Sequence, residues 1–257
     1  MNLFFRKYGQ GKPLIILHGI FGISDNWVTF GKRIAGKGFE VFIPDQRNHG
    51  KSMHHHTFNY YALVDDLHEF IEEHGIQDPI LMGHSMGGKV VMRYALENPE
   101  LVSKVVIVDV SLRTYVTQNY HRSLIRAMQS ADLENAGTRK EVEDQLAPQI
   151  KSERILQFII KNLYWRERNK LDWRLNLKAL DENLESMYDG VFYSTRYTGP
   201  ALFIRGGKSD YIIDDDIKAI EEKFPNATIQ TIPEGTHWVH ADDPEEFFAI
   251  VAGFLES

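Results

Sequence analysis

The sequence of 257 residues contains no cysteine. This absence excludes disulfide bonds, thiolate metal ligands and a cysteine nucleophile. Long hydrophobic runs are also missing, since no apolar stretch approaches the roughly 20 residues that cross a bilayer. The first residues lack the succession of basic, apolar and small residues that marks a signal peptide. We therefore expect a cytoplasmic protein without a membrane span.

Basic residues are in deficit as well. The chain has 29 Lys and Arg against 36 Asp and Glu, which gives a net charge of −7 at pH 7. Because the basic residues are dispersed along the chain, a nucleic-acid partner is not expected. Apolar residues make up 43% of the chain and charged residues 25%, which are ordinary values for a globular protein. The length fits one large domain with an insertion.

Apolar runs and helix-like segments alternate along most of the chain. This alternation predicts the α/β class, with a mostly parallel, doubly wound sheet between layers of helices. The near-continuous apolarity of 105–110 is typical of a strand covered on both faces. The predicted strands are 14–17, 41–44, 80–82, 105–110, 201–204 and 228–232, and the clearest predicted helices are 26–35, 60–74, 89–97 and 243–255.

The alternation stops between residues 112 and 199. This stretch is charged, favours helices and is poor in strand-like runs, and its aromatic residues include Trp165 and Trp173. We predict that residues 1–111 and 200–257 form the sheet domain. Residues 112–199 are predicted to form a helical cap, or lid, over the carboxyl ends of the strands.

The segment 83–87, Gly-His-Ser-Met-Gly, has the form G-x-S-x-G. It follows an apolar run and precedes a helix-like stretch, which is the context of a nucleophile elbow. The glycines let strand and helix converge around a sharp turn. The helix then presents free N–H groups and its positive end to a developing oxyanion. Ser85 is therefore predicted to be the nucleophile of a serine hydrolase.

A serine hydroxyl needs a neighbouring base, and eleven histidines compete for this role. His237 lies in a loop after the last predicted strand and before the final helix. This late position fits the chain order serine, acid, histidine. His240 is the alternative, but it lies nearer the start of the helix, where a structural role is favoured. His18 and His84 lie within sharp turns and are expected to shape the site.

The third member of such a triad is a carboxylate that orients the imidazole. Asp210 follows the predicted strand 201–204 and lies between the serine and the histidine along the chain, so it is the favoured acid. Asp109 ends the preceding strand and is the alternative. Either side chain could reach the histidine.

An oxyanion hole needs two fixed backbone N–H groups. The first is expected from Met86, directly after the serine. The second is expected from the loop 18–22, where glycines allow the backbone to approach a ligand. Ile20 is the preferred donor in this loop, and Phe21 is the alternative.

Several segments carry a family resemblance: 18–22 with Asn26 and Trp27, 45–52, 83–89, 206–211 and 235–241. With them the chain resembles the α/β-hydrolase superfamily, specifically its small bacterial acyl-esterase branch, whose animal relatives are called abhydrolase domain-containing proteins. The resemblance extends over the chain except for the insertion. The turn Arg47-Asn48-His49-Gly50 and the lysine after the elbow, Lys89, point to this branch over dehalogenases or lipases.

The resemblance implies the α/β-hydrolase fold and hydrolysis of small-molecule esters with short-to-medium acyl chains, or of acyl thioesters. Water is the only co-reactant, and neither a metal nor an organic cofactor is implied. Carbon–carbon bond hydrolases and cofactor-free haloperoxidases share the serine and are the enzymatic alternatives. A non-catalytic binding module is the remaining alternative, although such proteins usually lose a triad member and none is missing here.

Overall fold

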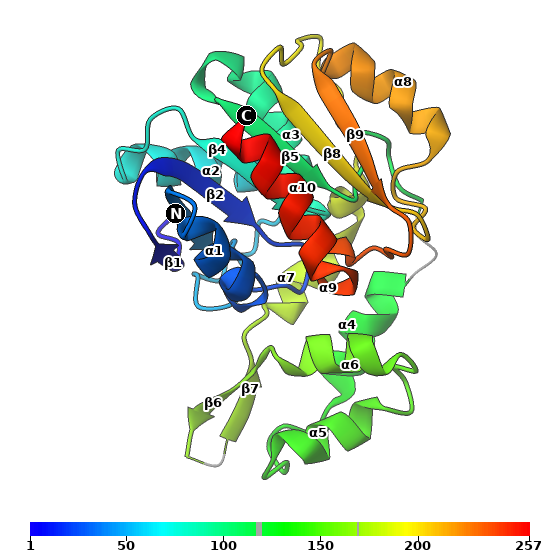
Figure 1. Ribbon diagram of the computed structural model, residues 1–257. Helices are drawn as coiled ribbons and strands as arrows, with labels where there is room; N and C mark the ends of the chain where they lie inside the picture. Colours follow the sequence, from blue (N-terminus) through cyan, green and yellow to red (C-terminus); the bar gives the residue numbers. More distant parts are fainter. Residues whose placement is uncertain (117–119, 169) are drawn as a thin grey trace.

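The computed structural model describes residues 1–116, 120–168 and 170–257 (Figure 1). Its centre is a seven-stranded sheet in the order β1-β3-β2-β4-β5-β8-β9. All six predicted strands lie in this sheet, with ends that shift by at most two residues. The strands are β1 (Phe5–Tyr8), β2 (Lys12–Leu17), β3 (Phe39–Pro44), β4 (Ile80–His84), β5 (Lys104–Val108), β8 (Ala201–Gly206) and β9 (Ala227–Ile232).

The sheet is parallel from β3 to β9, which confirms the predicted class. β1 was not predicted, and it runs antiparallel to β3, with Phe5 opposite Pro44. Two of its four residues, Arg6 and Lys7, are charged. An edge strand is half exposed and therefore needs no apolar run, so the sequence gives little sign of it.

Helices cover both faces of the sheet, because its inner strands are apolar on both sides. In β2, Leu14 and Ile16 join the core beneath α1 (Val28–Ala35) and α10 (Pro244–Glu256). Ile15 and Leu17 join the core on the other face, beneath α2 (Tyr60–Glu73), α3 (Met86–Glu97) and α8 (Asp214–Lys223). The helices of the sheet domain are α1 (Val28–Ala35), α2 (Tyr60–Glu73), α3 (Met86–Glu97), α8 (Asp214–Lys223), α9 (Val239–Asp242) and α10 (Pro244–Glu256), with short 3₁₀ turns η1 (Ser24–Trp27) and η2 (Pro99–Leu101).

The insertion between β5 and β8 lies beside the carboxyl ends of the strands, at the bottom of Figure 1. It contains α4 (Tyr120–Ser130), α5 (Arg139–Leu146), α6 (Glu153–Ile160), α7 (Leu177–Glu182) and the 3₁₀ turn η3 (Leu184–Tyr188). It also contains a two-stranded hairpin of β6 (Leu163–Glu167) and β7 (Lys170–Trp173).

The hairpin corrects the expectation of a purely helical insertion. Its strands are short and rich in charge, so they lack the apolar run by which the other strands were recognised. Trp173 is buried, and its indole N–H donates to the carbonyl oxygen of Met128 at 3.1 Å. This contact fixes the hairpin against α4.

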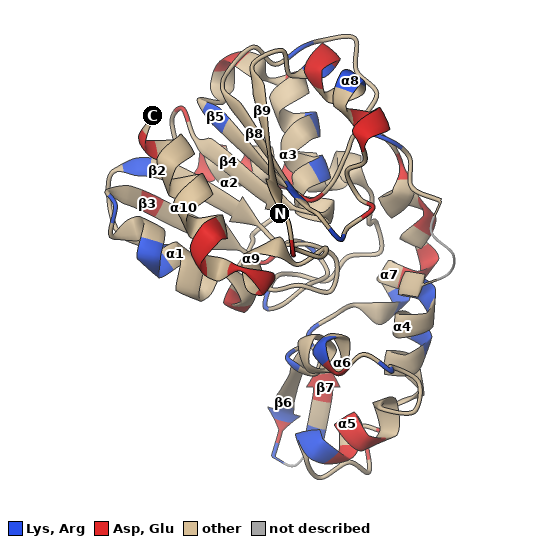
Figure 2. Cartoon of the chain, turned by 45° about the vertical axis from the view of Figure 1, so that its right-hand side comes forward, with Lys and Arg blue, Asp and Glu red and all other residues tan. Residues whose placement is uncertain are grey.

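Figure 2 shows Lys and Arg distributed over both the sheet domain and the insertion, interspersed with Asp and Glu. Within the described ranges, none of the helices combines the length and the apolar character needed to cross a membrane. The parallel strands end at one edge of the sheet, so the loops after β2, β4, β5, β8 and β9 meet there. These are the loops that carry the predicted site residues.

Candidate active site

Ser85 occupies the turn between β4 and α3. Its backbone has φ 53° and ψ −117°, a strained conformation for a residue other than glycine. A Cβ atom at Gly83 would lie 2.2 Å from the carbonyl oxygen of Gly87, and one at Gly87 would lie 2.5 Å from that of Leu17. The Ser85 N–H donates to the Val108 carbonyl at 3.0 Å, which ties the turn to β5. The turn has the geometry of a nucleophile elbow.

A histidine and a buried aspartate meet beside this turn. His237 Nδ1 lies 2.8 Å from Asp109 Oδ2, and the Asp109 side chain is fully buried. The carboxylate also accepts from the Ser209 hydroxyl at 2.5 Å and from the Gly206 N–H at 2.9 Å. Because Nδ1 donates its proton to the carboxylate, Nε2 of the neutral ring is free to act as a base.

Asp210 is not the partner of His237, so the preference for Asp210 was wrong. Its side chain is exposed, and its backbone carbonyl accepts a hydrogen bond from Arg113. The alternative, Asp109, makes the contact. It follows β5 in a left-handed conformation, with φ 48°, and is enclosed by the loop after β8. Asp210 lies in the same loop, between Ser209 and Tyr211, with its side chain exposed.

Ser85 and His237 line one cavity, but within residues 1–116, 120–168 and 170–257 no hydrogen bond joins the Ser85 hydroxyl to His237. Catalytic hydrogen bonds are often long in enzymes without substrate and tighten in the complex.

Two further side chains hold His237 in place. His84 Nε2 donates to the main-chain carbonyl of His237 at 2.7 Å. The Tyr211 ring stacks on the His237 ring, with centroids 3.7 Å apart and planes inclined by 20°. Burial, together with the neighbouring histidines, holds the pKa of His84 well below its usual value, so His84 is neutral. His84 was expected to shape the site. The contact of Tyr211 with His237 was not predicted, and only the place of Tyr211 in the segment 206–211 pointed to a role in the site.

The loop 18–22 approaches Ser85 closely, since a Cβ atom at Gly19 would lie 3.2 Å from the Ser85 Cβ. The Phe21 N–H donates to His49 Nε2 at 3.2 Å, so the alternative donor Phe21 is already engaged and that expectation is corrected. No hydrogen bond within the described ranges occupies the Ile20 N–H. Met86 is the first residue of α3, where an N–H has no partner inside the helix.

Two buried histidines, His18 and His49, hold the loop 18–22 against the segment 45–52. His18 Nε2 accepts from the Gln46 N–H at 3.0 Å, and His49 Nδ1 donates to the Arg47 carbonyl at 2.8 Å. Burial lowers the pKa of His18 to about 4 and that of His49 to about 3. Each ring is therefore neutral at pH 7 and donates from one nitrogen while accepting at the other.

His240, the alternative base, stacks on Trp27 with ring centroids 4.4 Å apart. Desolvation, with the charge of His237 as a smaller cause, lowers the pKa of His240 to about 3. Of these two histidines, His237 is the one whose ring contacts Asp109. The arrangement therefore favours His237 as the base and gives His240 a packing role.

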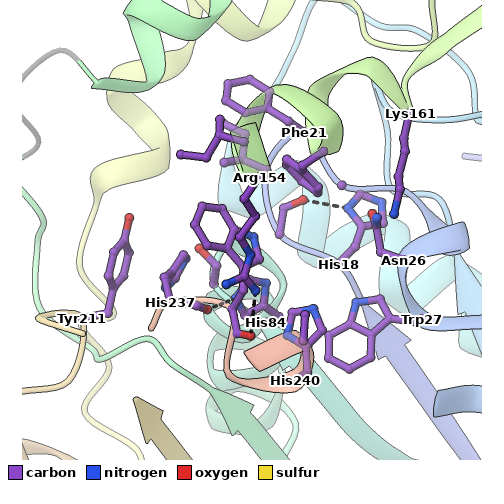
Figure 3. A pocket seen from close by; sticks show the side chains of 18 of the residues that line it. His18, Phe21, Asn26, Trp27, His84, Arg154, Lys161, Tyr211, His237 and His240 are labelled. Atoms are coloured by element: carbon purple, nitrogen blue, oxygen red, sulfur yellow. Dashed lines mark hydrogen bonds between the residues drawn. The ribbon is translucent and has the colours of Figure 1, made fainter. Parts of the chain in front are cut away.

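A cavity of about 1040 Å³ opens at Ser85. Figure 3 shows Tyr211 and His237 at one end of it and Trp27 and Lys161 at the other. The insertion contributes much of its wall, with side chains that include Tyr120, His121, Leu124, Ile155 and Phe158. Across the described part of the chain, no group of three or more His, Asp and Glu side chains is arranged to hold a metal ion.

Comparisons with known proteins agree with this geometry. The α/β hydrolase fold family model matches residues 12–142. The chain is 37% identical over 258 residues to the sn-1-specific diacylglycerol lipase ABHD11 of Danio rerio, a match that covers 98% of this chain and 81% of that protein. It is 28% identical over 246 residues to the esterase YbfF of Escherichia coli, with 96% of this chain and 94% of that protein covered.

Among solved structures, a marine microorganism esterase superposes with a TM-score of 0.95 at 38% identity, and the match covers 98% of this chain and 99% of that one. This coverage includes the insertion as well as the sheet domain. The resemblance expected from the sequence motifs is thereby confirmed. The chain belongs to the α/β-hydrolase family, alongside esterases and the ABHD11 lipases.

Proposed function

We propose that this protein is a carboxylic ester hydrolase that forms an acyl-enzyme on Ser85. The proposal rests on one observation above all, the hydrogen bond between His237 and the buried Asp109 beside a serine held in an elbow. The esterases and lipases among its relatives support ester chemistry. The substrate is a small-molecule ester, and an acyl thioester is the second substrate class to be tested.

In the first half of the reaction, the Ser85 hydroxyl oxygen bonds to the ester carbonyl carbon while its proton passes to Nε2 of His237. The N–H groups of Met86 and Ile20 donate to the oxyanion that forms. The bond from the carbonyl carbon to the alcohol oxygen then breaks. That oxygen takes the proton from His237, and the alcohol leaves.

Water completes the cycle. His237 accepts a proton from water as the water oxygen bonds to the acyl carbon, and the same two N–H groups stabilise the second oxyanion. The bond to the Ser85 oxygen breaks, Ser85 regains a proton from His237, and the carboxylic acid is released. Asp109 holds the Nδ1–H tautomer throughout and stabilises the imidazolium, an attraction that its burial strengthens.

We assign residues 1–111 and 200–257 to the catalytic domain and residues 112–199 to a cap. Lys89 supports this division, because its buried ammonium donates to the carbonyl oxygens of Arg113 at 3.0 Å and Tyr188 at 3.3 Å, and also to that of Asp189. These carbonyls lie near the two ends of the insertion, so α3 holds both ends beside the elbow. The cytoplasmic location stays a prediction, which cell fractionation would test.

The experiment measures release of nitrophenolate from p-nitrophenyl acetate and butyrate, with acetyl-CoA as a thioester in a parallel assay. We expect hydrolysis of the nitrophenyl esters and a loss of about 10⁴- to 10⁶-fold in kcat for Ser85→Ala. Ser103→Ala, at an exposed serine before β5, serves as the matched control and should keep wild-type activity. An enzyme inert on every ester, or an active Ser85→Ala variant, would contradict the proposal.

A further inference from the structure

Two spaces of very different size meet at Ser85. The larger is the cavity of about 1040 Å³, and the smaller is a recess of about 30 Å³. Both are lined by Ser85 and Ile20, but among the described residues His237 lines the larger space and not the recess. The remaining wall of the recess is formed mainly by Tyr60, Met86, Lys89, Val110, Tyr115 and Met187.

Reaction chemistry decides which half of an ester each space can hold. The leaving alcohol oxygen must receive a proton from His237, so the alcohol lies in the space that His237 lines. The acyl group stays bonded to Ser85 after the alcohol has left. Its carbonyl oxygen points at the Met86 N–H, and Met86 is also part of the recess wall. Of the two spaces that meet at Ser85, the recess is the one that His237 does not line among the described residues, so it is the space left for the acyl chain.

The recess is small. One water-sized group needs about 10–15 Å³ of such space, so the recess of about 30 Å³ holds about two or three non-hydrogen atoms. Tyr60, Val110 and Met187, which line it, are all buried. The protein surrounding them is close-packed and resists expansion.

Three of the polar groups around the recess, those of Tyr60, Tyr115 and Lys89, already have partners. The Tyr60 hydroxyl donates to the Met187 carbonyl at 3.0 Å, and the Tyr115 hydroxyl accepts from the Ser111 N–H at 2.7 Å and donates to the Tyr211 carbonyl. The Lys89 ammonium is bound to main-chain carbonyls, as described above. A ligand group in the recess would thus meet mainly apolar side chains and aromatic rings.

We infer that the recess is the acyl pocket, and that the substrates are esters of a short unbranched acid of about two to four carbons with a large alcohol. The inference rests on the proposed function, because it uses the proton transfer from His237. The cavity of about 1040 Å³ then accommodates the alcohol, against side chains of the insertion such as Leu124 and Phe158.

Two substrate series test the inference on the wild-type enzyme. One series lengthens the acid, from p-nitrophenyl acetate through butyrate to octanoate, and the other lengthens the alcohol, from ethyl through hexyl to decyl acetate in a pH-stat assay. We expect kcat/KM to rise up to about fourfold per methylene as far as butyrate. At octanoate it should fall by at least about tenfold, because extra methylenes overpack the recess. The acetates should show no such fall with a longer alcohol.

Two substitutions test which side chains surround the acyl group and which surround the alcohol. Met187→Ala enlarges the recess and should raise the ratio of octanoate to acetate hydrolysis by about tenfold or more. Phe158→Ala, in the wall of the larger cavity, is the matched control. It should lower kcat/KM for decyl acetate but leave the octanoate-to-acetate ratio of the nitrophenyl esters as in the wild type.

The outcomes separate the two proposals. Rapid hydrolysis of nitrophenyl octanoate together with slow hydrolysis of decyl acetate would overturn the pocket assignment and leave ester hydrolysis intact. The pocket assignment would also be overturned if Phe158→Ala, and not Met187→Ala, changed the acyl preference. Absence of hydrolysis in both series would instead contradict the proposed function itself. The wild-type series decides the assignment even if Met187→Ala does not fold.

Discussion

Replacing Asp109 with asparagine removes one negative charge from a fully buried side chain and keeps its shape. Three donors converge on this carboxylate: the His237 Nδ1–H at 2.8 Å, the Ser209 hydroxyl at 2.5 Å and the Gly206 N–H at 2.9 Å. An amide offers only one oxygen, and its NH₂ group must face one of these donors. The variant therefore cannot accept from all three donors at once.

The size of the effect follows from the two ways in which the amide can lie. If its oxygen accepts from Gly206, its NH₂ group faces His237 and favours the tautomer with the proton on Nε2, which cannot take the Ser85 proton. If the amide is flipped, NH₂ meets the Gly206 N–H in a buried site, at a cost of about 1–3 kcal/mol. Together with the lost stabilisation of the imidazolium, we expect kcat to fall by about 10⁴-fold, or about 5 kcal/mol in activation free energy.

The matched control is Asp210→Asn, because Asp210 is exposed and, within the described part of the chain, its one hydrogen bond is the one that its main-chain carbonyl accepts from Arg113. This variant should hydrolyse p-nitrophenyl acetate at close to the wild-type rate. Both variants are compared by kcat after circular dichroism has shown unchanged secondary structure. A nearly normal Asp109→Asn enzyme, or an equal loss in Asp210→Asn, would refute the assignment of Asp109 as the residue that orients His237.

Two further predictions concern stability. Burial lowers the pKa of His18 to about 4 and of His49 to about 3, so below about pH 6.5 the unfolded chain binds protons that the folded state does not. Stability is therefore full above that pH and should fall by about 2 kcal/mol per ring by about pH 5; a urea midpoint unchanged between pH 7 and 5 would contradict neutral rings. Lys89→Met takes a donor away from the part-buried carbonyls of Arg113 and Asp189, at about 1–3 kcal/mol each. Proteases should then cut the insertion faster than in the exposed-site control Lys178→Met, and equal cleavage would contradict the anchoring role.

Much of this architecture could be predicted because it rests on local patterns. The glycines around Ser85 are required by backbone contacts within the turn itself, so their spacing is visible in the sequence. The inner strands of the parallel sheet are buried on both faces, so each of them appears in the sequence as an apolar run. His237 was found from its position after the last strand, which is fixed by chain order in this fold.

The features that were missed depend on contacts between distant segments. Asp109 and Asp210 both follow strands that end at the same edge of the sheet, and only the left-handed turn at Asp109 and the loop after β8 decide which one is buried. Phe21 was excluded as an oxyanion donor by a hydrogen bond to His49, 28 residues away. No pattern in the loop 18–22 indicates that contact.

Rapid-quench mass analysis detects an acyl group on Ser85 directly. The enzyme is mixed with p-nitrophenyl acetate and quenched in acid within the first turnovers, and the intact mass is measured before digestion for peptide mapping. We expect a mass increase of one acetyl group, on the peptide that contains Ser85, and no such increase in Ser85→Ala. An acetyl group on another residue at wild-type turnover, or steady hydrolysis by Ser85→Ala, would contradict an acyl-enzyme on Ser85.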